Sequence, residues 1–244
     1  MPSNPLYRRA QRLSLALLAV AGLGCARFPD NPGVVSGTRL VFSLTTDGPV
    51  RFGTEPLTLG NPYIYIFAIN LSTDTSPITF GPKPVVVTPF GNGLMTGDAT
   101  HFILWDPQRN ASQFLIYRFN TTTLETYFST GVPVIPHLAE VGDKVLRCEV
   151  DLSQLEPDAT ARAALKSIQV NVLTMDKQGG TGGGRNWDAF GDGRLPSEIN
   201  TAFTIPLTTS GTYNNTRASI KEPRGDQVDP ALDLVDWQVE VQLR

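Results

Sequence analysis

The chain is poor in the residues that build reactive centres. Its 244 residues include two cysteines, two histidines and three methionines, and only 18% are charged. It contains no Cys-x-x-Cys, His-Glu-x-x-His or Gly-x-Ser-x-Gly sequence. Its lysines and arginines form no cluster of the kind that binds nucleic acid. We therefore predict no catalytic residues, a protein that is not an enzyme, and no nucleic-acid partner.

Long apolar runs are also missing, with one exception near the start. Residues 13–24 (LSLALLAVAGLG) are uncharged and follow Arg8, Arg9 and Arg12. A membrane-spanning helix needs about 20 apolar residues, which this run does not reach. A cationic start, a short apolar centre and small residues before a cleavage position are typical of a secretory signal. We predict that residues 1–24 are a signal peptide, whose removal changes the formal net charge from −3 to about −6.

The end of this run, Gly22-Leu23-Gly24-Cys25, resembles the lipobox of bacterial lipoproteins. The resemblance implies cleavage before Cys25, acylation of this residue and a lipid-anchored protein at the outer membrane or cell surface. Several acyl chains hold a protein stably at a membrane. Residues 25–38 would then be the lipidated cysteine and a tether. Gly22 departs from the usual Leu or Val, so an ordinary secretory signal that yields a secreted protein and a retained apolar segment stay open as alternatives.

The rest of the chain has the pattern of an all-β domain. Glycine and proline separate short apolar stretches of strand length. We predict a single domain over 39–244, an antiparallel β-sandwich of jelly-roll type with one short helix. The expected strands are 39–46, 63–70, 83–88, 101–106, 113–119, 124–129, 145–152, 167–175, 201–207 and 234–243.

The patterns within these segments predict which faces are buried. Segment 63–70 is apolar on both faces and should be central, whereas 234–243 alternates and should have one solvated face. Segments 101–106 and 113–119 should also be covered on both faces and form a hairpin. Cys148 shares a face with Leu146 and Val150, which predicts a small buried apolar residue. The helix is expected in LEPDATARAALKS (155–167), with Asp158 near its start.

Several segments resemble the DOMON-like β-sandwich superfamily as it occurs in bacterial lipoproteins. They include NPYIYIFAINLST, PFGNGLMTGDATHFILWD, VLRCEVDLSQL, IQVNVLTMDK and DPALDLVDWQVEV. The resemblance implies a module that binds a sugar or haem or contacts another protein. For haem, it implies a Met paired with His or Lys as axial ligands. The chain offers Met95, Met175, His101, His137 and Lys177.

Two loops supply the residue types expected at a ligand or partner site. Phe90 and Asn92 lie in the loop 88–101, and Arg185, Trp187 and Asp188 lie in the glycine-rich segment 176–194. Aromatic rings that stack on sugars, beside side chains that bond hydroxyls, would suit a glycan. The alternative is that Trp187 is a buried structural residue, because large aromatics are highly buried on average.

The same glycine-rich segment contains three possible calcium ligands. Asp176, Asp188 and Asp192 supply carboxylate oxygens, although their spacing is not that of an EF-hand. A surface loop without a metal is the alternative. We predict a membrane-anchored, non-catalytic interaction module of an envelope assembly, with an envelope protein or a glycan as its partner. A carbohydrate-binding module and a haem-binding electron-transfer domain remain the other hypotheses.

Overall fold

The computed structural model describes residues 37–53, 63–86, 91–109, 112–120, 123–177, 186–195, 201–219 and 221–244. Residues 37–244 form one compact unit. The predicted signal peptide, Cys25, Phe90 and Arg185 lie outside the described residues. None of the helices in the described part combines the length and apolar character needed to cross a membrane.

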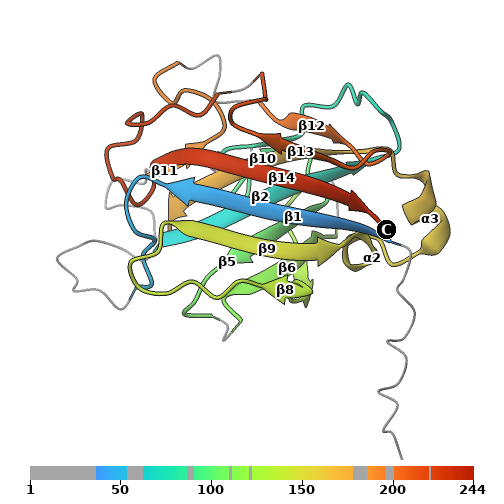
Figure 1. The fold of residues 1–244 in the computed structure, drawn as a ribbon, viewed down its shortest axis with the longest axis horizontal. Helices are drawn as coiled ribbons and strands as arrows, with labels where there is room; N and C mark the ends of the chain where they lie inside the picture. Colours follow the sequence, from blue (N-terminus) through green and yellow to red (C-terminus); the bar gives the residue numbers. More distant parts are fainter. Residues whose placement is uncertain are drawn as a thin grey trace, which may run out of the picture. The chain divides into compact units, whose positions relative to one another are not determined.

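Two antiparallel sheets form a β-sandwich, as predicted (Figure 1). Sheet A has the order β13 (Gly211–Asn214), β14 (Leu234–Leu243), β1 (Thr38–Thr46), β9 (Val145–Asp151) and β8 (Ile135–Pro136). Sheet B has the order β11 (Trp187–Ala189), β10 (Ser167–Asp176), β2 (Tyr63–Ser72), β5 (His101–Trp105), β6 (Phe114–Phe119) and β7 (Tyr127–Gly131), and β12 (Phe203–Pro206) also pairs with β10. A small ribbon joins β3 (Pro82–Lys83) to β4 (Thr96–Gly97). The jelly-roll connectivity stays a prediction.

The main core lies between the sheets and is built from alternate residues of their strands. Phe42 of sheet A meets Phe67 of sheet B, with ring centroids 5.4 Å apart, and Trp237 also belongs to this core. A second apolar cluster covers the other face of sheet B, where Met95 and Ala99 join side chains of β2, β5, β6, β10 and β11. Sheet B is therefore covered on both faces, which confirms the prediction for 63–70.

Strand β14 confirms the predicted half-buried pattern, because Trp237, Val239 and Val241 are buried and alternate with more exposed residues. Leu243 departs from it and is 45% exposed at the strand end. The predicted hairpin is confirmed by the pairing of β5 with β6. Cys148 is completely buried in β9, and burial raises the pKa of its thiol. A small apolar role therefore fits Cys148.

Other predicted boundaries are wrong for local reasons. Of the expected strand 83–88, β3 ends at Lys83, because Pro84 has no N–H to donate to a ladder, and residues 87–88 lie outside the described residues. The expected strand 124–129 begins only at Tyr127. Leu124, which precedes it, has a positive φ of 57°. The short strands β4, β8, β11 and β13 were not predicted.

The helical region contains two short helices where one was predicted. Helix α2 is Leu152–Leu155, and helix α3 is Ala159–Ala164. Asp151 caps α2 by accepting from the Ser153 N–H at 2.8 Å. Because the helix begins at Leu152, strand β9 ends at Asp151, one residue earlier than predicted. Asp158 caps α3 by accepting from the Ala161 N–H at 2.7 Å, as expected.

We expect Phe67→Ala to lower the free energy of unfolding by about 3–5 kcal/mol, because it empties space in the centre of the main core. Val228→Ala is the matched control, since Val228 is 97% exposed and its truncation should change stability by less than about 0.5 kcal/mol. Urea unfolding of the purified variants measures both values. Equal losses in the two variants would contradict this description of the core.

Candidate functional site: the distal end of the sandwich

Most of the polar side chains that could form a functional site lie at the end of the sandwich far from Thr38. This distal end consists of β11 and the loops 47–53, 106–109, 137–144 and 221–233. Main-chain hydrogen bonds join these loops, from Asp47 N to Asp233 O at 2.8 Å and from Val50 N to Asp143 O at 2.8 Å. The nine residues of β1 separate this end from Thr38 by about 26 Å.

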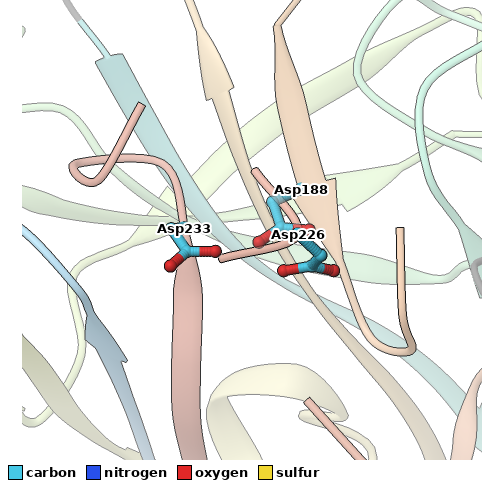
Figure 2. Close-up of side chains that lie close together, drawn as sticks. All are labelled: Asp188, Asp226 and Asp233. Carbon is cyan, nitrogen blue, oxygen red and sulfur yellow. The ribbon is translucent and has the colours of Figure 1, made fainter. Parts of the chain in front are cut away.

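Three aspartates meet at the distal end. Asp188, Asp226 and Asp233 each place one carboxylate oxygen within 4.8 Å of the others, and Figure 2 shows the three carboxylates facing a common space. Asp188 comes from β11 in sheet B, and Asp233 directly precedes β14 in sheet A. Asp188 Oδ2 also accepts from the Leu234 N–H at 2.8 Å. The cluster therefore lies where the two sheets are joined.

A fourth carboxylate, Glu222, is buried beside this cluster and is 4% exposed. Its Oε2 accepts from the Gly191 N–H at 3.1 Å. Its Oε1 is buried and has no hydrogen-bond partner, and the same is true of Asp226 Oδ1. Within the described part of the chain, no lysine or arginine forms an ion pair with any of these four carboxylates. Two oxygens are thus buried without a donor.

Burial makes these groups difficult to ionise. It raises the pKa of Asp188 to about 8 and, together with the charges of Asp188 and Asp226, raises the pKa of Glu222 to about 11. The pKa of Asp226 is also raised, chiefly by burial. Asp188 and Glu222 therefore hold protons near neutral pH unless a cation compensates their charge.

A second polar group lies nearby on the surface of the distal end. Arg51 Nη2 binds Asp229 Oδ2 at 2.8 Å, and the hydroxyl of Tyr63 donates to the same carboxylate oxygen. The Arg51 guanidinium also lies 4.5 Å from the centre of the Tyr63 ring. Hollows of about 320 and 550 Å³ flank this ion pair, and Asn186 and Gln227 line the larger one.

Three of the predicted ligand-binding residues, Asn92, Trp187 and Asp188, lie in the described part of the chain. Asn92 Oδ1 accepts from the Leu94 and Met95 N–H groups, and its Nδ2 donates to Leu124 O at 3.0 Å, so this side chain fixes its own loop. Trp187 is half-buried and packs against the second apolar cluster, as the structural alternative predicted. Asp188 is buried.

The predicted calcium ligands are not brought together as a set. Asp188 belongs to the carboxylate cluster, but Asp192 binds its neighbour Arg194 at 2.7 Å. Asp176 ends β10 and accepts from the Asn186 N–H at 3.2 Å. Sequence reasoning missed Asp226, Asp233 and Glu222. The only signal for them was an acid-rich turn sequence, EPRGDQVDPALD, over residues 222–233.

The side chains considered for haem also lie apart. Met95 and Met175 are buried in the cluster on the outer face of sheet B. His101 is two residues before Ile103 in β5, so both side chains point to the same face of the sheet. Ile103 belongs to the core on the inner face, so His101 also lies on that face. His137 is exposed, and Lys177 binds Asp106 at 2.9 Å. No methionine is placed beside either histidine on one face of the sheet.

A third feature is a segment at the edge of the two sheets that is rich in exposed apolar side chains, here called the apolar strip. Thirteen large apolar side chains are exposed among the described residues, and eight of them lie within residues 127–145. This segment joins β7, at the edge of sheet B, to β8, at the edge of sheet A, and then leads to β9. The strip consists of Tyr127, Phe128, Val132, Val134, Ile135, Leu138, Val141 and Val145, each 38–81% exposed.

His101 predicts a pH dependence of stability. It lines a cavity of about 450 Å³ near the opposite end, with Arg118 and Glu156, and is 2% exposed. Burial, helped by the charge of Arg118, lowers the pKa of His101 to about 4. Between pH 6.5 and about 4 the unfolded chain therefore binds a proton that the folded chain does not, so stability falls as the pH falls.

We expect protonation of His101 in the unfolded chain to lower the free energy of unfolding by about 2 kcal/mol between pH 7 and pH 4.5. In His101→Gln the difference between the two pH values should shrink by that amount, as urea unfolding would measure. His137→Gln, which replaces the exposed histidine, is the control. An unchanged difference in His101→Gln would show that His101 does not titrate in this way.

Comparison with known proteins assigns no family to this chain. No protein-family model, curated protein or solved structure matches it. Its function must therefore be inferred from its own residues.

Proposed function

We propose that this protein is a lipid-anchored envelope lipoprotein whose β-sandwich binds another envelope protein and catalyses no reaction. The signal-like residues 1–24 and the lipobox-like sequence ending in Cys25 support export and acylation. The compact unit begins at Gly37, one residue before the end predicted for the tether. The 12 residues between Cys25 and Thr38 span at most about 40 Å, which sets how far the domain reaches from the membrane.

The apolar strip is the observation that carries this proposal. Monomeric soluble proteins rarely expose large apolar patches, and such patches mark sites of protein or membrane contact. The strip also coincides with the edge strands of both sheets. Edge strands present main-chain groups that can pair with another chain. Apolar side chains next to such an edge suit a protein partner with an apolar face.

A glycan is the second candidate partner and would bind at a different place. Arg51, Asn186 and Gln227 border the larger hollow of the distal end and offer guanidinium and amide groups. Such groups hydrogen-bond hydroxyls. Gln227 already donates to Trp187 O at 2.7 Å and accepts from the Val228 N–H, however, so part of this capacity is used within the protein. The apolar strip therefore favours protein over sugar.

Acylation predicts a specific change in partitioning. We expect the native protein to sediment with membranes, with an intact mass that lacks residues 1–24 and includes acyl chains. Cys25→Ser should abolish both acylation and membrane retention, because the sulfur that carries the lipid is absent. Cys148→Ala is the control and should stay with membranes. Equal partitioning of the two variants would refute the lipid anchor.

The partner surface is tested by photo-crosslinking in cells. A photoreactive residue at Val141 should give a discrete adduct with an envelope protein, whereas one at Val228, which is also exposed, should not. Leu138→Glu should weaken formation of the Val141 adduct at least about tenfold, because it brings an unpaired charge into an apolar interface. Identical adducts from both positions, or no effect of Leu138→Glu, would contradict the proposal.

A further inference from the structure

We propose that Asp188, Asp226 and Asp233, together with Glu222, bind one Ca²⁺ ion that connects the two sheets at the distal end. The first observation is convergence, since three carboxylate oxygens from two segments, β11 and loop 221–233, lie within 4.8 Å of one another (Figure 2). Ligands of one Ca²⁺ ion lie 2.3–2.6 Å from it, so two of them are at most about 5 Å apart. The separations thus allow a shared ion.

The second observation is the pair of unpartnered oxygens. Glu222 is 4% exposed, and its Oε1 is buried without a hydrogen-bond donor, as is Asp226 Oδ1. A buried carboxylate oxygen without a donor costs free energy, and native proteins satisfy nearly all such atoms. Glu222 and Asp226 accept from the N–H groups of Gly191 and Gly193, two residues apart in one turn, which places the Glu222 carboxylate beside the cluster. A cation would satisfy both oxygens at once.

Main-chain groups already hold the carboxylates in fixed orientations. Asp226 Oδ2 accepts from the Gly193 N–H at 2.6 Å, and Glu222 Oε2 accepts from the Gly191 N–H. Asp233 accepts from the Gly225 N–H through both oxygens. The other oxygen of each of these two side chains, Asp226 Oδ1 and Glu222 Oε1, has no hydrogen-bond partner. These bonds orient Asp226 and Glu222 while leaving one oxygen of each for the ion, whereas Asp188 and Asp233 accept main-chain hydrogen bonds through both oxygens and would use their remaining lone pairs.

The ligand set favours Ca²⁺ over other cations. All four side chains supply oxygen, which hard cations prefer, and none supplies nitrogen or sulfur. Mg²⁺ usually retains several waters and takes one or two carboxylates, whereas Ca²⁺ accepts many protein oxygens in a flexible geometry. We expect the ion to link β11 with the start of β14 and with loop 221–233. Binding should therefore stabilise the folded protein.

The test is calorimetric titration of the purified, chelator-treated protein with CaCl₂ and with MgCl₂, and thermal unfolding in each salt. We expect one Ca²⁺ per chain, weaker Mg²⁺ binding, and a rise in Tm of about 5–10 °C at a Ca²⁺ concentration one hundred times Kd. A CaCl₂ concentration of about 10 mM exceeds the Kd of even weak extracellular Ca²⁺ sites. The absence of both a heat of binding and a change in Tm at this concentration would overturn the proposal.

Variants locate the ion and separate lost binding from lost folding. Asp226→Asn and Glu222→Gln should each lose most of the Ca²⁺-dependent rise in Tm. Without Ca²⁺ they should be about as stable as the native protein, because each puts an uncharged amide of the same shape in place of a buried carboxyl group whose ionisation burial disfavours. Asp192→Asn is the control and should keep the full response. A full response in Asp226→Asn and Glu222→Gln would place the ion elsewhere and refute the site.

Discussion

The structure depends on the fact that sheet B is apolar on both faces. Every residue of β2 from Tyr63 to Asn70 is buried, and β10 is buried along its whole length. Such a sheet must be covered twice. Sheet A covers one face, and the segment that includes Met95 and Ala99 covers the other. Sheet A can therefore keep a solvated outer face, and the described part of the chain contains two very short helices.

Covering sheet B on both faces forces polar groups into the interior, where each needs a partner. Asn171 is fully buried on β10, accepts from the Phe190 N–H and donates to Pro82 O and Thr201 O, so it fastens neighbouring loops to the sheet. Thr174 donates to Leu232 O, and its register partner Asp188 accepts from the Leu234 N–H. These contacts hold the start of β14 against sheet B and explain why carboxylates gather at this junction.

The proposed functions use different residues. The predicted tether leads to the sandwich at Thr38, the carboxylate cluster lies at the far end, and the apolar strip follows residues 127–145 from β7 and β8 into the loop 137–144 of the distal end. An ion at the junction would stabilise the scaffold without occupying the strip. Binding of a protein partner and binding of Ca²⁺ can therefore be changed by different substitutions, which makes the two proposals independent.

The sequence by itself determined the fold class, most long strands, the buried position of Cys148 and the cap at Asp158, because periodicity and capping are local properties. Only the tertiary structure decided the site. Asp188 meets Asp226 and Asp233 because β11 pairs with β10 while Leu234 pairs with Thr46, across nearly 190 residues of chain. The exposed edge at 127–145 has the same origin, since a strand's own sequence does not show whether another strand will lie beside it. Which loops meet and which strand edges lack a neighbouring strand depends on pairing between residues far apart in the sequence. Patterns within a single sequence do not encode this pairing.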